Sequence, residues 1–423
     1  VQTCALPISV SLPSAESAVW FPARRETARM GETSRGLMPL ELPRILTVRP
    51  RDFQLVRKPS ESGAKFELEL ATSVDEFEPH RAPWRELVDA GAGSNIYMTP
   101  EFLEPNLEFV QSEPYVVAFL YRQLSERRRH LVAVAAFSRK SPSWKRPYHH
   151  LVPLDNRYFW NPTPLLHPAE RQETWSALLA HLADRRHPWR TVDLVADREV
   201  ELPQPSRSIA IWDAPGVAAL HKPLTREAYH RRRSSSSVRS ERRRLRQIRQ
   251  LGNVRVTAET HMSHGSVEEF LTLESAGWKG SQGTALLSRD SDANFFRIVT
   301  SLAEREGRLI FVTLRLDEKL IGASVMLQLG TTVQAFKLCY DESLRKYAPG
   351  LLTAAACVDH FLASDHLHIA MAGGFADGWQ RNFFLDLQPR VTVHVAQDKK
   401  LSRQLSRGLR VWRTLRARMT TRA

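Results

Sequence analysis

The sequence predicts an α/β (α+β) fold of two similar halves, each a mixed but mostly antiparallel sheet flanked by helices. Alternating apolar and polar residues recur with the period of strands, and stripes with the period of helices separate them. This cycle occurs twice between Lys65 and Val395. A chain of 423 residues is long enough for two or three domains.

The composition is that of a folded and strongly basic protein. Hydrophobic residues make up 42% and charged residues 25%, which excludes a globally disordered chain. No apolar run reaches the roughly 18 to 20 residues that cross a bilayer. The net charge of +14 favours anionic partners such as nucleic acid, lipid or a phosphate-bearing cofactor. The three cysteines lack metal or disulfide spacing, so we expect a cytoplasmic protein without a bound metal.

Residues 1–63 are expected to be a disordered leader that is partly artefactual. The first methionine is Met30, and residues 1–8 resemble a peptide translated from a sequencing adapter. Residues 31–63 are rich in Pro, Arg, Ser and Gly. We therefore leave this segment out of the predicted fold.

The first predicted domain covers residues 64–215. Residues 65–71 alternate as a half-buried strand does, and residues 75–90 have helical spacing. Two strands of a hairpin are expected at 115–121 and 130–138, followed by a helix at 175–182 and a strand at 191–195. A proline-containing connection from Pro203 to Pro223 is expected to lead to the second half.

The second predicted domain covers residues 216–395. Three consecutive antiparallel strands are expected at 308–316, 320–329 and 331–340, because short turns join them. A helix begins near Pro349, and a strand follows at 368–371. The junction from Tyr347 to Leu352 has the form of a phosphate-binding loop, since a helix N-terminus presents unpaired N–H groups. Pro349 and Gly350 are equally at home in an ordinary loop-to-helix junction, so both interpretations stay open.

Short motifs in both halves support a more specific interpretation. They are Trp278-Lys279-Gly280, Gly283-Thr284-Ala285, Lys337, Tyr340-Asp341-Glu342 and Tyr347-Ala348-Pro349-Gly350, with Trp84, residues 95–100 and residues 163–166 in the first half. Together they resemble the GNAT acyltransferase superfamily. In particular, they are similar to the double-GNAT acetyltransferase family associated with cellulose and exopolysaccharide biosynthesis, and more distantly to Fem-type peptidyltransferases.

The resemblance implies two GNAT-like folds, the second binding acetyl-CoA or another acyl-CoA. The implied activity is N- or O-acyl transfer to an envelope-related, exopolysaccharide or other small acceptor. The implied coenzyme contacts are Tyr347, Pro349, Gly350, Leu351 and Leu352, and the implied acceptor contacts are Trp278, Lys279, Lys337, Trp379 and Arg381. One stretch departs from the family, because Trp379-Gln380-Arg381-Asn382-Phe383 stands where a Tyr-Lys pair is common. Arg381 supplies a neighbouring positive charge, but an arginine fork is not equivalent to a lysine ammonium.

Acyl transfer needs a base for the acceptor and an acid for the departing thiolate. The carboxylates nearest the motifs are Glu274, Asp341 and Glu342. Asp341 and Glu342 are the candidate bases, and Tyr340 is the candidate acid, because they precede the predicted phosphate loop. Each has an alternative role: the carboxylates as caps of the loop, the tyrosine as a packing residue. Cys339 and Cys357 lack a diagnostic histidine nearby and are expected to pack in the core.

Other functions stay open at this point. Trp278 is as well explained as a core aromatic, and Lys279 as a solvated charge. A degenerate pair of domains is compatible with a non-catalytic scaffold in a polysaccharide system, whereas a Fem-like chain would use an aminoacyl-tRNA donor.

Two basic segments remain. Residues 222–249 favour a helix with a solvated basic face, with a polyanion partner as the alternative because arginine binds phosphate bidentately. Only Tyr229 is available there for stacking on bases, so sequence-specific nucleic-acid binding is not expected. Residues 396–423 are predicted to form a basic amphipathic helix that docks on the protein or anchors it peripherally at the anionic inner membrane face.

Overall fold

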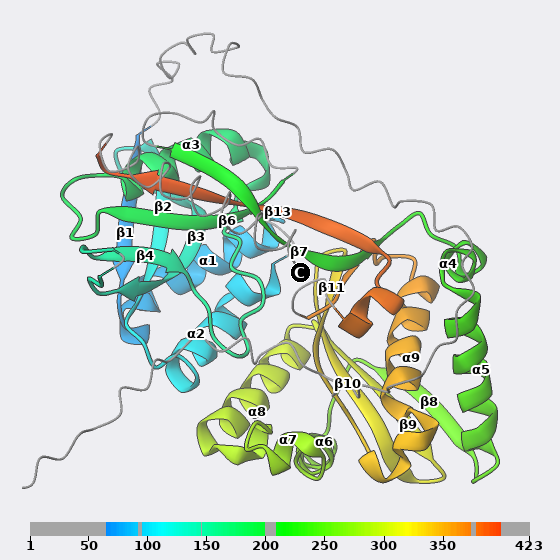
Figure 1. Cartoon of the computed structure of the whole chain (residues 1–423). Coiled ribbons are helices and arrows are strands. Elements are labelled where there is room, and N and C mark those ends of the chain that lie inside the picture. Colours follow the sequence, from blue (N-terminus) through cyan, green and yellow to red (C-terminus); the bar gives the residue numbers. More distant parts are fainter. Residues whose placement is uncertain (1–64, 92–94, 145, 199–208, 374–377, 399–423) are drawn as a thin grey trace, which may run out of the picture. The chain divides into compact units, whose positions relative to one another are not determined.

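The computed structural model describes residues 65–91, 95–144, 146–198, 209–373 and 378–398. The predicted leader and residues 399–423 of the predicted C-terminal helix lie outside this part of the chain. Within it, the predicted mixed fold with a mostly antiparallel sheet flanked by helices is confirmed (Figure 1). No helix in the described ranges is both long and apolar enough to cross a membrane.

The first half alternates strands and helices as its sequence predicts, with longer strands. Its elements are β1 (Phe66–Ala71), α1 (Glu78–Asp89), α2 (Pro100–Phe109), β2 (Tyr115–Ser125), β3 (Arg128–Lys140), β4 (His150–Pro153), β5 (Leu165–Leu166), α3 (Arg171–Leu182) and β6 (Thr191–Asp197).

The second half contains the predicted three-stranded meander and the helix that follows it. Its elements are β7 (Ile209–His221), α4 (Arg226–Arg232), α5 (Ser235–Arg249), β8 (Val254–Glu259), α6 (His264–Ser275), α7 (Trp278–Ser281), α8 (Asp290–Arg305), β9 (Leu309–Leu316), β10 (Lys319–Leu329), β11 (Thr332–Tyr340), α9 (Pro349–Ala363), β12 (Ile369–Met371) and β13 (Asp386–Ala396).

The two halves repeat one topology. In the first, β1, β2, β3 and β4 pair antiparallel in turn, and β6 then pairs parallel with β4. In the second, β8, β9, β10 and β11 do the same, and β12 pairs parallel with β11. Helices α3 and α9 therefore occupy equivalent places, each at the crossover between two parallel strands.

The strand that follows the parallel pair of each repeat joins the sheet of the other repeat: β7 follows β6 in the chain, and β13 follows β12. β13 pairs with β6, β7 pairs with β12, and β7 and β13 pair with each other. One sheet therefore runs through the described residues in the order β1-β2-β3-β4-β6-β13-β7-β12-β11-β10-β9-β8. The predicted division between residues 215 and 216 falls inside β7 and stays a prediction.

β7 corrects the expectation that residues 203–223 are only a connection. Pro215 and Gly216 lie in the middle of this strand, where they suggest a turn. The register between β7 and β13 shifts between Gln388 and Arg390, which is a β-bulge. A bulge accommodates both the missing N–H of Pro215 and a local bend at Gly216, so the strand continues through them.

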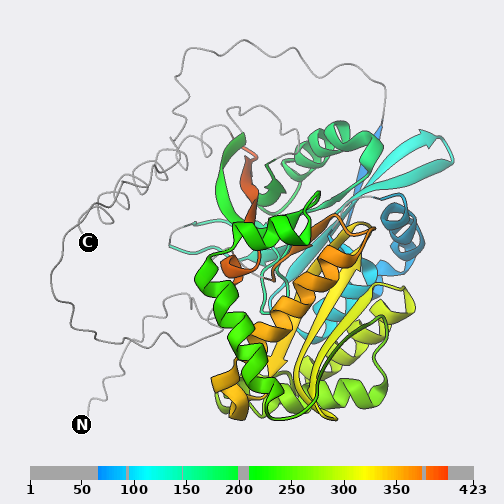
Figure 2. The same ribbon diagram turned by 90° about the vertical axis from the view of Figure 1, so that its right-hand side faces the viewer.

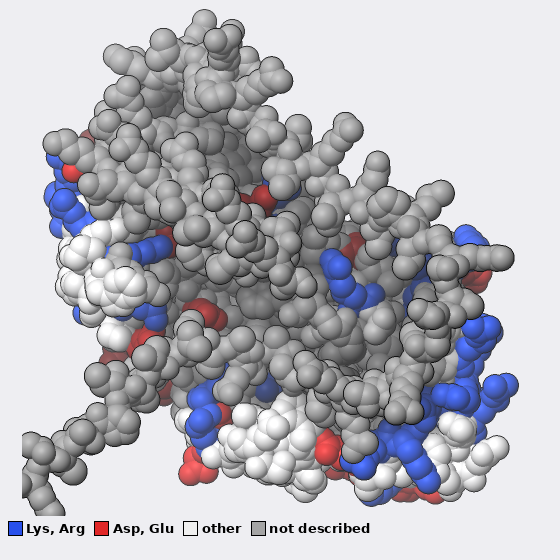
Figure 3. Space-filling view, viewed as in Figure 1, with Lys and Arg blue, Asp and Glu red and all other residues white. Residues whose placement is uncertain are grey.

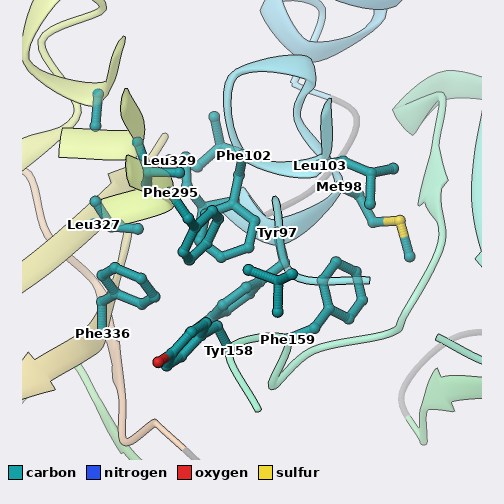
Figure 4. Packing of buried hydrophobic residues seen from close by; sticks show 14 of the residues in the cluster. Tyr97, Met98, Phe102, Leu103, Tyr158, Phe159, Phe295, Leu327, Leu329 and Phe336 are labelled. Carbon is teal, nitrogen blue, oxygen red and sulfur yellow. The ribbon is translucent and has the colours of Figure 1, made fainter. Parts of the chain in front are cut away.

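Helices cover both faces of the sheet (Figures 1 and 2). Side chains of α1, α2, α6 and α8 share one continuous core, while α3 and α9 pack on the opposite face. The shared core joins the two halves, because Phe102 of α2 lies 5.6 Å, between ring centroids, from both Phe295 of α8 and Phe336 of β11 (Figure 4). The halves are thus held together by apolar packing as well as by the exchanged strands.

We predict that Gly216→Ala destabilises the protein by about 1 to 3 kcal/mol, the usual cost of overpacking. An added Cβ would lie 2.7 Å from Cδ1 of Leu387 and 2.9 Å from the backbone oxygen of Gln388, at the seam between β7 and β13. Urea unfolding measures the loss. Gly265→Ala is the matched control, because its Cβ meets only Ser263 Oγ at 3.8 Å. Equal stability of the two variants would contradict a tight seam.

Candidate functional site

Strands β11 and β12 separate in the middle of the second half. They pair only over Thr332–Gln334 and Ile369–Met371. β11 then continues to Tyr340, while the segment after β12 passes close to β11 at Gly373. A Cβ there would lie 2.5 Å from the carbonyl oxygen of Ala335. Within the described residues, the side of β11 that faces β12 therefore has no strand partner beyond Gln334. Its backbone groups there are suited to bind an extended ligand.

A β-bulge lies at the same point of β11. Val325 of β10 pairs with Lys337 and Met326 pairs with Ala335, so Phe336 is the extra residue. Bulges are common beside active sites because they redirect side chains. Here Phe336 enters the shared aromatic core, and the ammonium group of Lys337 approaches Glu274 of α6.

Glu274 organises a cluster of buried charges next to this bulge. Its Oε1 accepts a hydrogen bond from Lys279 Nζ at 2.8 Å, and its Oε2 accepts one from the Leu286 N–H at 2.8 Å. Lys337 Nζ lies 3.7 Å from the same Oε1. Burial by itself raises the pKa of Glu274, but Lys279, Lys337 and the hydrogen bonds lower it to about 2. Glu274 is therefore a permanent anion and not a proton acceptor near neutral pH.

Lys337 has weaker contacts than Lys279. Lys279 Nζ also donates to the carbonyl oxygen of Leu338 at 3.0 Å, whereas Lys337 Nζ lies over the ring of Tyr158, 4.2 Å from its centroid. Burial lowers the pKa of Lys337 to about 8, although the charge of Glu274 opposes this shift. Its amine can therefore exchange a proton close to neutral pH.

The first half contributes the aromatic wall of this cluster. Tyr158, in the segment after β4, donates a hydrogen bond to Asp292 of α8 at 3.0 Å and stacks on Phe295. Arg157 pairs with the same carboxylate at 2.8 Å. Burial raises the pKa of Tyr158, so its hydroxyl stays protonated. The cluster is complete only when both halves are in place.

The junction before α9 has the predicted loop-to-helix form. A 3₁₀ helix, η6 (Glu342–Tyr347), ends at Ala348, whose φ of 54° is left-handed, and Pro349 begins α9. A Cβ at Gly350 would lie 2.7 Å from Cδ1 of Tyr340, so this glycine allows the tyrosine ring to pack on the first turn of α9. Burial raises the pKa of Tyr340.

The predicted cofactor contacts differ in exposure. Pro349, Gly350 and Leu352 are buried, whereas Tyr347 and Leu351 are half-buried. Leu352 packs in a small apolar cluster with Ile248 of α5, and Tyr347 lies against it. The backbone of the junction, more than these apolar side chains, is therefore the part suited to an anion.

Asp341 and Glu342 have the contacts of capping groups. Asp341 Oδ1 accepts the Ser343 N–H at 2.9 Å, and its Oδ2 lies 2.6 Å from Lys319 Nζ. Burial alone raises the pKa of Asp341, but Lys319 and Ser343 lower it. Glu342 Oε1 accepts the N–H of Trp278 at 2.9 Å. These contacts favour the capping alternative, and the catalytic roles stay predictions.

The structure thus brings some predicted residues together and leaves others apart. Lys279 and Lys337 meet at Glu274, and Trp278 meets Glu342 through its backbone. Arg381 is exposed on η7 (Gly378–Asn382), and the side chain of Trp379 lies outside the described residues.

Asp292 and Tyr158 were absent from the predicted site, and Glu274 was named only as a carboxylate near the motifs, without a role. The Trp-Lys-Gly motif that follows α6 points to Glu274, which precedes it by only a few residues. No motif of the sequence identifies Tyr158 or Asp292, because they come from separate halves of the chain.

The remaining reactive groups have structural contacts. Cys339 and Cys357 are buried, and burial raises the pKa of both thiols, that of Cys357 to about 12. They therefore fit the predicted packing role. Among the described residues, no three His, Cys, Asp or Glu side chains gather in a way that would hold a metal ion.

Residues 232–387 match the family model described as an acetyltransferase (GNAT) domain. The predicted resemblance of the second half to GNAT proteins is thereby confirmed, whereas the narrower exopolysaccharide family stays a prediction. None of the curated proteins matches the chain.

Several solved structures are similar over most of their length. One is a conserved protein of unknown function from Bacteroides thetaiotaomicron VPI-5482 (TM-score 0.46, 10% identity, covering 74% of this chain and 97% of that one). Another is FemX (TM-score 0.46, 9% identity, covering 76% and 97%). A third is a tandem GNAT protein from the clavulanic acid biosynthesis pathway (TM-score 0.38, 13% identity, covering 78% and 99%).

We predict that Lys337→Met changes how stability depends on pH. The folded-state pKa of about 8 lies below the ordinary 10.5, so the unfolded chain binds more protons between these values. The wild-type protein should therefore gain stability relative to the variant as pH rises from 8 to 10.5, by up to about 3 kcal/mol. Urea unfolding at several pH values measures the gain. Lys319→Met, at an exposed lysine, is the control, and parallel profiles for all three proteins would contradict the burial of the amine.

Proposed function

We propose that the chain is an acyltransferase that uses acetyl-CoA or another acyl-CoA as donor and acylates an amine or hydroxyl group. The observation that carries this proposal is the separation of β11 from β12 directly before the N-terminus of α9, inside the segment that matches the GNAT domain. The amide groups of an extended pantetheine arm can pair with the free side of β11. The pyrophosphate then meets the helix N-terminus, as phosphates commonly do.

The charges of the two equivalent junctions support the second half as the donor-binding half. At α9, the preceding helix η6 carries the exposed cations Arg345 and Lys346. At α3 of the first half, the corresponding position is Glu170, which pairs with Arg122 at 2.8 Å. A carboxylate at this helix N-terminus already interacts with the dipole and repels a phosphate.

The cluster at Glu274 supplies the chemical features that acyl transfer needs. The acceptor loses a proton as its nitrogen or oxygen attacks the thioester carbonyl, and the sulfur leaves as a thiolate that takes up a proton. Lys337 lies one residue beyond the bulge, and the pKa of its ammonium group, about 8, is close to the pH of a neutral solution. We assign it to hold or accept a proton at the acceptor, with Lys279 and Glu274 fixing its position.

The acceptor is proposed to be an envelope-related or exopolysaccharide component, with the protein in the cytoplasm and peripheral to the inner membrane face. The resemblance of the motifs to the double-GNAT family supports this acceptor class. The basic charge of the chain is in keeping with a location beside anionic lipid.

Titration calorimetry of the full chain tests the donor. We expect acetyl-CoA to bind and charged tRNA not to compete with it. Binding of charged tRNA in place of acetyl-CoA would favour an aminoacyl-tRNA-dependent transferase, and binding of neither donor would favour a scaffold without catalysis. Either result would overturn the proposed function.

We predict that Gly350→Ala weakens acetyl-CoA binding at least tenfold, about 1.4 kcal/mol. The new Cβ would lie 2.7 Å from the Tyr340 ring, which must move and shift the backbone at the start of α9. Calorimetry on the folded variant measures the affinity, and circular dichroism checks the fold. Gly265→Ala, which has room for its Cβ, serves as control. An unchanged affinity would remove this junction from the donor site.

We predict that Asp341→Asn and Glu342→Gln separate catalysis from capping. A general base contributes about 10²- to 10⁴-fold to the rate, whereas loss of a cap costs about 0.5 to 2 kcal/mol of stability. Asn and Gln keep an oxygen that accepts the same backbone N–H, so we expect turnover reduced less than tenfold and a stability loss no larger than the lower end of this range. Steady-state rates and thermal unfolding measure the two effects. A rate loss above a hundredfold in a stable variant would instead identify the base.

A further inference from the structure

Helix α5 presents a continuous stripe of arginines to solvent. Arg239, Arg242, Arg243, Arg246 and Arg249 are all exposed. Their spacing of three and four residues places them along one face, over about 15 Å of helix. Figure 3 shows Lys and Arg gathered on the edge of the molecule where Figure 1 places α5.

The opposite face of α5 is already occupied. Leu245 and Ile248 pack with Leu352 of α9 and Leu314 of β9 in a small apolar cluster. Arg244, on the flank, donates a hydrogen bond to the carbonyl oxygen of Lys346. The helix is therefore fixed with its five arginines outward and cannot turn its apolar side to a partner.

The five arginines form no ion pair with the residues that the structure describes. Neighbouring arginines are paired within the protein: Arg226 with Asp359, Arg232 with Asp386 and Arg233 with Glu241. None of the five has an ion pair with another described residue, and Glu241 is the one acidic residue on α5. Like charges at these spacings destabilise a helix. An anionic partner would remove this repulsion.

Two exposed aliphatic residues lie at the C-terminal end of the stripe. Leu251 follows α5 and is 46% exposed, and Val256 of the edge strand β8 is 50% exposed. Val256 is on the same face of β8 as Val254, which packs against the α5 cluster. Arginines beside exposed aliphatic groups suit a lipid surface, where the aliphatic groups enter the interface. A single-stranded nucleic acid would instead use aromatic stacking, and α5 contains no aromatic residue.

We infer that this surface, formed by the five arginines with Leu251 and Val256, docks the protein on an anionic lipid bilayer. The docking is electrostatic in its main part, because the stripe adsorbs to the negative surface while the two aliphatic residues insert shallowly. It is independent of the acyl-transfer proposal and of residues 399–423, since it needs only α5 and the edge of β8.

Sedimentation of the full chain with vesicles tests this inference. The wild-type protein should bind vesicles that contain phosphatidylglycerol, release as salt screens the charges, and ignore vesicles of phosphatidylcholine alone. The triple variant Arg239→Glu, Arg242→Glu, Arg246→Glu should bind at least tenfold more weakly. The control Arg127→Glu, Arg128→Glu, Arg171→Glu makes the same charge change at exposed residues of the first half and should bind as the wild type does.

Further variants test the role of the aliphatic residues and distinguish a lipid partner from RNA. Leu251→Asn together with Val256→Thr should weaken vesicle binding and leave the thermal midpoint unchanged. If the glutamate variant fails to fold, the corresponding glutamine variant replaces it, since it keeps the helix-forming side chains. Full vesicle binding by the stripe variant, or an equal loss in the control, would overturn the inference. So would a wild-type protein that ignores anionic vesicles but binds RNA through the stripe.

Discussion

The buried carboxylate of Glu274 is the interaction on which the arrangement of the site depends. It holds Lys279, the backbone of Leu286 and, at longer range, Lys337, and so joins α6, the segment before α8 and strand β11. Removing one charge from a buried group of this kind leaves the others uncompensated, which costs far more than an exposed ion pair does. The segment between α6 and α8 forms only the short helices α7 and η5 (Leu286–Ser288), and this carboxylate binds a residue of each of them.

The same constraint requires both halves of the chain. The ammonium group of Lys337 lies over the ring of Tyr158, and Tyr158 is held by Asp292 and Phe295. The exchanged strands and the shared aromatic core keep the first half against the second, so the wall of the cluster does not depend on a mobile interface. Neither half alone would carry the complete set of contacts.

The sequence predicts the parts of the fold whose patterns are regular, and misses those that the site distorts. β9, β10, β11 and α9 follow from alternation and a helical stripe, and their ends agree closely with the structure. α6 was not predicted, because Glu274 lies on its buried face and interrupts the apolar stripe. α8 is an exception, because its buried Phe295, Val299 and Ala303 have regular helical spacing and the pattern could have identified it. β7 was missed because Pro215 and Gly216 imitate a turn. Contacts such as Lys337 with Tyr158 depend on the packing of distant segments, which no local pattern records.

The two repeats therefore differ in charge more than in topology. Each has a helix that begins at the crossover between two parallel strands, but Glu170 lies before α3 whereas Arg345 and Lys346 lie before α9. Because the sheets are alike, the backbone offers similar N–H groups at both places, and the side chains make the junction before α9 the more suitable one for the anion of the proposed donor. The segment after β4 in the first half reaches α8 of the second half. It supplies Tyr158 to the charged cluster at Glu274. Under the proposed function, one repeat binds the donor while the other supplies the aromatic wall beside it.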